Sequence, residues 1–191
     1  MGVTAGASRR SILSNSIERA SASSGAAALF CAGTGVAAVA IDVVFHVPLH
    51  LPGHHGLTQM ALLIIASCVT RRPWAATLSA ATSAALAVPL FGLSPLAPSL
   101  YLLSGLVIDG LCLAGRSWRE SVWFLAALGG VGNGAKAIEH WLLGGIVAGH
   151  GHLMAAGFAF SMFSHVAFGV AGGLLAAQLW LSTDASKKHG H

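Results

Sequence analysis

The chain has 191 residues, of which 55 % are hydrophobic and 8 % are charged, and its mean hydropathy is +0.75. In soluble domains about a quarter of the residues are charged. This composition therefore excludes an ordinary soluble globular protein and indicates an all-α integral membrane protein. The formal net charge of +4 comes from Lys and Arg residues that lie almost entirely between apolar segments or at the chain ends. This distribution is typical of membrane topology and does not indicate a nucleic-acid partner.

Residues 1–24 are rich in Ser and Ala and contain Arg9, Arg10 and Arg19. The apolar run that follows continues to Val47, which is too long for the hydrophobic part of a cleaved signal peptide. We therefore predict a cytoplasmic N-terminal tail over 1–24, a membrane domain over 25–182, and a cytoplasmic C-terminal tail over 183–191.

A helix needs about 20 apolar residues to cross the hydrocarbon core of a bilayer. Six segments reach or approach this length, so the sequence predicts six transmembrane helices. The second is short by this measure. The predicted segments are 26–47, 57–70, 73–91, 98–115, 120–148 and 152–181.

The basic residues give the orientation. With six spans, every basic connection and both basic termini fall on one side, which the positive-inside rule assigns to the cytoplasm. The basic residues outside the spans are Arg9, Arg10, Arg19, Arg71, Arg72, Arg116, Arg119, Lys187 and Lys188. The loops around 48–56, 92–97 and 149–151 contain no Lys or Arg and are expected on the outer side.

Histidines gather in two of these outer loops. Four fall within ten residues of the first loop, where Pro48, Pro52 and Gly53 prevent a regular helix. Neutral imidazole is a common ligand of transition metals, so the loops predict a metal site facing outward. The alternative is a polar loop that is incidentally rich in histidine. The predicted metal ligands are His46, His50, His54, His55, His150 and His152.

Ionisable side chains inside apolar segments are costly and usually face a cavity or a partner. Those near the outer loops predict a substrate pocket below them, formed by Asp42, Glu139, His140 and His165. The alternative is a Lys136–Glu139 pair, one helical turn apart, that neutralises itself and joins helices. His165 alone is also consistent with a hydrogen-bonded packing residue. Asp109 lies deep in the fourth segment, nearer the cytoplasmic side.

Small residues recur where helices are expected to pack. In the first segment Ala28, Ala32 and Gly35 form a stripe for close docking, either within the protein or against a partner subunit. The glycines over 129–134 favour close helix packing, with a loosened helix as the alternative.

The segment from Val47-Pro48 to Gly56-Leu57-Thr58-Gln59, with six predicted helices and an alanine-rich first helix, resembles the substrate-binding components of energy-coupling factor transporters. The strings His46-Val-Pro48 and His50-Leu-Pro52-Gly53 resemble the His-x-Pro signature of the cobalt and nickel members. In those members the signature is N-terminal and the terminal amine binds metal; here it is internal, so that amine is not a ligand.

The resemblance implies capture of a divalent transition metal, or a small metal-linked or vitamin-like solute, at the outer face of a bacterial inner or plasma membrane. It also implies a separate membrane scaffold and ATP-binding subunits as partners, and the chain itself has no GxxxxGK[ST] phosphate loop. We expect no catalytic residues and no enzymatic activity.

Two other functions stay open. The spacings His46-x3-His50 and His50-x3-His54 resemble the histidine boxes of metal-dependent membrane oxidoreductases. A haem-binding helical bundle would instead use His140 and His165 on facing helices. A structural subunit of a larger membrane complex is a third possibility.

Overall fold

The computed structural model describes residues 23–44, 52–91, 97–148 and 154–188, and all regular structure within these ranges is helical. The predicted all-α class is therefore confirmed. The α-helices and one short 3-10 helix, η1, are α2 (Ser24–Val44), α3 (Gly56–Thr70), α4 (Ala75–Phe91), α5 (Ala97–Ala114), η1 (Arg116–Trp118), α6 (Val122–Ala148) and α7 (Met154–Lys188).

The helix bounds agree with the predicted segments to within a few residues, except at the C-terminal end. There α7 continues to Lys188, past the predicted boundary of the membrane domain at residue 182. Two described helical stretches, Ser24–Val44 and Gly157–Ser182, are long and apolar enough to cross a membrane. Six spans with both termini in the cytoplasm therefore stay a prediction.

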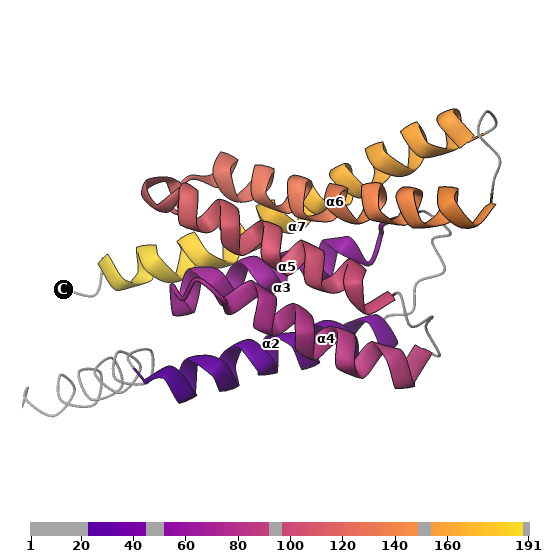
Figure 1. The fold of residues 1–191 in the computed structure, drawn as a ribbon. Helices are drawn as coiled ribbons and strands as arrows, with labels where there is room; N and C mark the ends of the chain where they lie inside the picture. Colours follow the sequence, from indigo (N-terminus) through magenta and orange to yellow (C-terminus); the bar gives the residue numbers. More distant parts are fainter. Residues whose placement is uncertain (1–22, 45–51, 92–96, 149–153, 189–191) are drawn as a thin grey trace, which may run out of the picture.

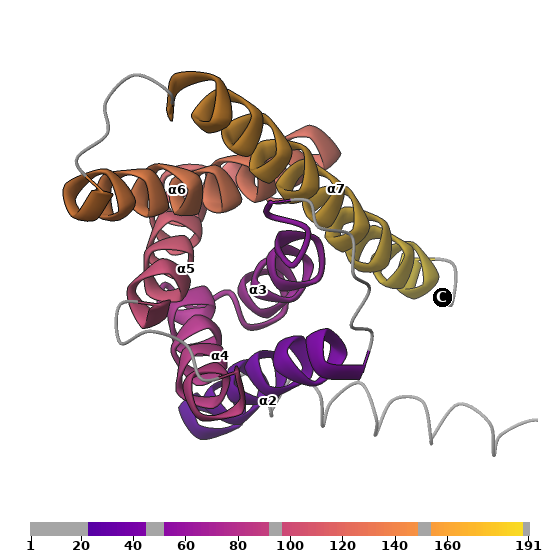
Figure 2. The same ribbon diagram turned by 90° about the vertical axis from the view of Figure 1, so that its right-hand side faces the viewer.

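Successive helices run antiparallel (Figure 1), and α6 and α7 cross the bundle at an angle to α3 (Figure 2). The 71–74 connection and the η1 segment lie at the same end of the bundle, together with the start of α2 and the end of α7. The arginines of these two connections are thus gathered at one end, as the topology argument requires.

Helix α3 lies at the centre of the bundle and the other α-helices surround it (Figure 2). It contacts α2, α4, α5, α6 and α7, and ten of its fifteen residues are buried. At 1.5 Å per residue it is only about 22 Å long. Its first residue, Gly56, is buried, whereas Arg71, which follows its last residue, is exposed.

The helices approach closely because small residues line their contacts. Added side-chain atoms at Gly129, Gly169 or Gly173 would collide with backbone of the facing helix in the α6–α7 pair. Helix α6 is continuous across residues 129–134, so these glycines serve packing, which was the favoured interpretation, and do not loosen the helix.

The small-residue face of α2 is used inside the molecule. Its buried positions include Ala27, Cys31, Gly35 and Ala38, and Gly35 lies directly against the backbone of α4 at Ser79. Ala32, at the centre of the predicted stripe, is only half-buried. Of the predicted stripe, Gly35 thus docks α2 on its own bundle, whereas Ala28, like Ala32, is only half-buried.

The buried carboxylate of Asp109 on α5 has a structural role. Its oxygens accept hydrogen bonds from the backbone N–H groups of Ala76 (3.0 Å) and Thr77 (2.8 Å), and from the hydroxyls of Thr77 (2.7 Å) and Ser67 (3.4 Å). The first N–H groups of a helix have no partner within it. Asp109 supplies that partner to α4 from a neighbouring helix.

Candidate functional site

The turn at residues 52–55 is held against the middle of α6 and α7. The carbonyl oxygen of Pro52 accepts a hydrogen bond from the Ser164 hydroxyl at 2.6 Å. That of Gly53 accepts one from Nδ2 of Asn133 at 3.3 Å. Asn133 lies fifteen residues before the end of α6, a distance of about 22 Å along the helix. The turn thus contacts α6 about halfway along that helix, at the end of the bundle where α2 ends and α5 begins (Figure 1). Its place in an outer loop stays a prediction.

Glycine is required at two points of this contact. Gly53 has φ +81°, a left-handed conformation, and a Cβ there would lie 2.7 Å from Cγ of His165. At Gly56, the first residue of α3, a Cβ would collide with the Asn133 amide. The backbone of the turn can therefore approach α6 and α7 closely only because these positions lack side chains.

Asn133 joins the turn to both long helices. Its side chain is fully buried, and besides Gly53 its Nδ2 donates to the backbone oxygen of His165 at 2.7 Å. One amide group thus fixes the relative positions of the turn, α6 and α7. This residue was not among the predicted site residues.

Next to this contact, polar groups from four helices converge. Nζ of Lys136 on α6 donates a hydrogen bond to Oε1 of Gln59 on α3, and it lies 4.9 Å from the ring centroid of Tyr101 on α5. The carboxylates whose charges act on Lys136 are those of Asp42 on α2 and Glu139 on α6. We call Asp42, Gln59, Tyr101, Asn133, Lys136 and Glu139 the central polar cluster.

Three buried atoms of this cluster have no hydrogen-bond partner among the described residues. They are Nε2 of Gln59, Oδ1 of Asn133 and Oε2 of Glu139. Buried polar atoms are nearly always satisfied, and each unsatisfied one costs about 1–3 kcal/mol. The cluster therefore offers one amide donor and two oxygen acceptors for a further polar group.

The predicted pocket residues are partly brought together. Asp42 and Glu139 both belong to the central polar cluster, whereas the expected alternative, an ion pair between Lys136 and Glu139, is not formed between the described side chains. Nδ1 of His165 lies 2.8 Å from the backbone oxygen of Ser161, one turn earlier in α7. His140 lies on α6, but its side chain is outside the described part.

Two of the six predicted metal ligands are described. Nδ1 of His55 lies 3.5 Å from Oδ1 of Asp42, and the rings of His54 and His55 have centroids 3.9 Å apart. His46, His50, His150 and His152 lie outside the described residues. Within the described ranges, no group of three or more His, Cys, Asp or Glu side chains is placed to hold a metal ion.

The cluster residues that the sequence reasoning missed are the amides Gln59 and Asn133 and the phenol Tyr101. Each interrupts an otherwise apolar segment, and Asn and Gln in such segments commonly form hydrogen bonds between helices. The sequence therefore contained a signal for these three residues, but the predicted pocket was built from acidic and histidine side chains alone.

No protein-family model, no curated protein and no solved structure matches this chain.

Proposed function

We propose that the chain is an integral membrane protein that captures a small polar solute for uptake from the outer side of the membrane. The solute is a transition-metal ion or a small compound that carries one. Uptake would be energised by separate scaffold and ATP-binding subunits. The observation that carries the proposal is the central polar cluster, with its three unsatisfied buried atoms beside a non-helical turn packed against α6 and α7.

The distribution of apolar residues supports a membrane environment. Large apolar side chains lie on the outside of the bundle, among them Leu29, Trp123 and Phe163, which are 77 %, 81 % and 73 % exposed. The buried residues, by contrast, include many Ala, Ser and Cys side chains. Water-soluble monomers rarely expose such extensive apolar surface, whereas helices in lipid pack through small residues and face outward with large ones.

The packing of the turn against two long helices supports solute capture. Non-helical backbone at membrane depth is tolerated where it is buried in protein or lines a cavity. In many transporters such interrupted segments form the substrate site near the midplane of the bilayer. The turn at 52–55 shares two features of such segments, because it is packed against α6 and α7 and is followed by the short helix α3.

The charges of the cluster favour a solute that has both donors and acceptors. Lys136 offers a cation, Asp42 and Glu139 offer carboxylates, and Gln59 and Asn133 offer amides. A purely apolar ligand would leave the three unsatisfied atoms unpaired and gain nothing from them.

For the metal form of the proposal, the supporting contact is the one between His55 and Asp42. A carboxylate beside an imidazole orients the ring and increases its basicity when the other ring nitrogen binds a metal. His55 is half exposed, and it follows the segment that contains His46 and His50.

The first experiment identifies what the cluster holds. The full chain is purified, and the copurifying compound is analysed by mass spectrometry and elemental analysis. Gln59→Glu keeps an oxygen for Lys136 but removes the unsatisfied Nε2 donor, so retention of the compound should fall at least about tenfold. Ser104→Ala, at a buried hydroxyl that bonds only within α5, is the matched control and should retain it. Equal retention by both variants would contradict the assignment of the cluster as the site.

The metal form is tested by isothermal titration with nickel, cobalt, zinc and copper. The quadruple alanine variant of His46, His50, His54 and His55 should lose affinity by orders of magnitude, because loss of a group that merely orients a ligand already costs about 10–100-fold. Binding should weaken on acidification, since protons compete for imidazole. Unchanged affinity in the quadruple variant would exclude a metal site in this loop and leave an organic solute.

A metal-dependent membrane oxidoreductase or haem-binding bundle is the second candidate. The observation for it is the contact of the His165 Nδ1 with a backbone carbonyl, an arrangement common for histidines that ligate metal through the other nitrogen. Haem absorbs strongly in the visible range, so a colourless purified protein would exclude the haem form.

A further inference from the structure

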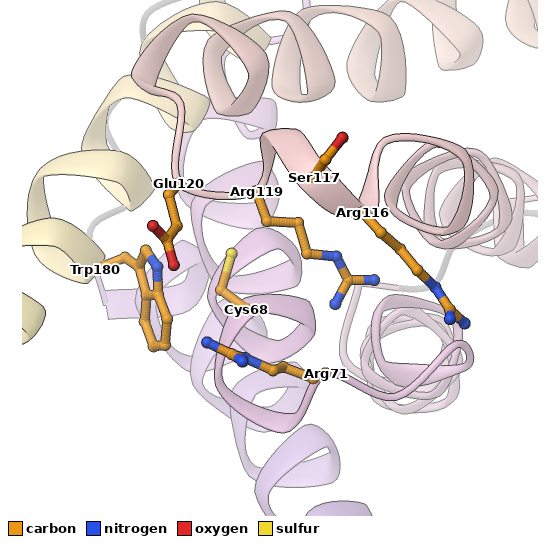
Figure 3. A pocket seen from close by; sticks show the side chains of 7 residues that line it. All are labelled: Cys68, Arg71, Arg116, Ser117, Arg119, Glu120 and Trp180. Carbon is orange, nitrogen blue, oxygen red and sulfur yellow. The ribbon is translucent and has the colours of Figure 1, made fainter.

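At the opposite end of the bundle from the central polar cluster, a cavity of about 530 Å³ is lined by residues of three helical elements, α3, η1 and α7, and of the two connections beside them. Figure 3 shows Trp180 and Glu120 on one side, Arg116 and Ser117 on the other, and Cys68, Arg71 and Arg119 between them. Three arginines against one glutamate leave the lining with an excess of positive charge. We call it the arginine cavity.

Two of the three guanidinium groups have spare hydrogen-bonding capacity. Arg71 and Arg116 are exposed and form no ion pair with any described carboxylate. Arg119 uses Nε (3.3 Å) and Nη2 (3.0 Å) to donate to the backbone oxygen of Cys112 at the end of α5. This bond holds the third guanidinium at a fixed place in the wall.

The backbone at Arg71 is unusual. This residue ends α3 in the left-handed conformation, with φ +53° and ψ +22°, and its N–H donates to the Ser67 oxygen at 3.0 Å. Glycine is the usual residue at such a helix end because a side chain there is strained. Arginine gains nothing from the backbone conformation itself. The presence of arginine in place of glycine is therefore explained by its side chain, which lines the cavity.

From the cavity, its lining and this backbone, we propose that the arginine cavity is a binding site for a phosphoryl group. Guanidinium groups match the oxygen geometry of phosphate and bind it through paired hydrogen bonds. Ser117 adds a hydroxyl, and the indole of Trp180 adds an apolar wall for the part of the ligand next to the phosphate. The phosphoryl group belongs either to an anionic lipid headgroup or to a soluble phosphate compound.

Both sources are tested on the purified full chain. For the lipid source, native mass spectrometry measures retention of phosphatidylglycerol against phosphatidylcholine from mixed detergent micelles. For the soluble source, isothermal titration uses inorganic phosphate and pyrophosphate. The variant is Arg71→Ala with Arg116→Ala, which leaves the Arg119–Cys112 bond intact. Arg72→Ala is the control, because it removes an equal charge from the neighbouring position without touching the cavity lining.

We expect wild type to bind one of the probes preferentially, and the double variant to bind it at least about tenfold more weakly. Arg72→Ala should bind like wild type, and Arg71→Lys should fall between them because lysine loses the paired geometry. Preference for phosphatidylglycerol identifies a lipid site, and saturable phosphate or pyrophosphate binding identifies a soluble ligand. The proposal is overturned if neither probe binds, or if Arg72→Ala weakens binding as much as the double variant does. A stability measurement on each variant separates loss of binding from loss of folding.

Discussion

The substitution Asp109→Asn is predicted to destabilise the whole bundle, although the change is nearly isosteric. The carboxylate of Asp109 accepts four hydrogen bonds, two of them from the first N–H groups of α4. An Asn side chain keeps one acceptor oxygen and turns an NH₂ group toward the donors that bonded the other. Those donors then lose their acceptor in a buried place.

The size of the effect follows from the bonds lost. A hydrogen bond to a charged group contributes about 1.5–3 kcal/mol, and a buried donor left unsatisfied costs about 1–3 kcal/mol. With one of the two oxygens lost, we expect destabilisation of about 2–4 kcal/mol. In a chain of this size each kcal/mol lowers Tm by about 2–4 °C, so Tm should fall by about 4–16 °C. Asp109→Ala removes both oxygens and should exceed this.

Thermal unfolding of the full chain in detergent, followed by intrinsic fluorescence, measures this difference. Glu120→Gln is the charge-matched control, because Glu120 is exposed at the same end of the bundle. If Asp109→Asn and Glu120→Gln unfold within about 2 °C of each other, the carboxylate does not hold the start of α4 and the reasoning fails.

Three further predictions use other parts of the bundle. In intact cells, Ser99→Cys at the start of α5 should react with a membrane-impermeant thiol reagent and Ser117→Cys in η1 should not; the reverse pattern would invert the proposed orientation. Gly53→Ala should lower stability by about 1–3 kcal/mol, because alanine is strained at φ +81° and its Cβ would collide with the His165 ring. Gly33→Ala, which has open space around it, is the control in the same thermal unfolding assay. Gly169→Ala should lower Tm by several degrees by pushing α6 and α7 apart, and a Tm equal to that of Gly33→Ala would show that the close helix contact is not needed.

The sequence allowed the helices to be placed because apolar run length and the basic residues between runs are local features. It also predicted a polar pocket that includes Asp42 and Glu139, whose charges both act on Lys136. Depth could not be predicted. Nothing local shows that the 52–55 turn packs against the middle of α6, because that position depends on Gly53 and Gly56 meeting Asn133, eighty residues away.

The histidines illustrate a second limit of composition. Their density predicts metal chemistry, yet a ligand set needs side chains from several places to converge on one point, which spacing along the chain does not fix. Gln59 and Asn133 gave a weaker signal in the sequence, but both are buried and form hydrogen bonds between elements. The position of Asp109 within its apolar segment could be read from the sequence, but its hydrogen-bond partners at the start of α4 could not.

The central position of α3 has a consequence for the order in which the protein is completed. This helix is made before α4 to α7, yet Gly172 of α7 lies directly against its Leu57 backbone. Until α7 is made, the side of α3 at Leu57 and Met60 lacks the helix that packs against it. The packing of α3 is therefore incomplete until α7 has been made. Proteins lacking the C-terminal helix should be degraded as incomplete chains, and should not persist as smaller folded bundles.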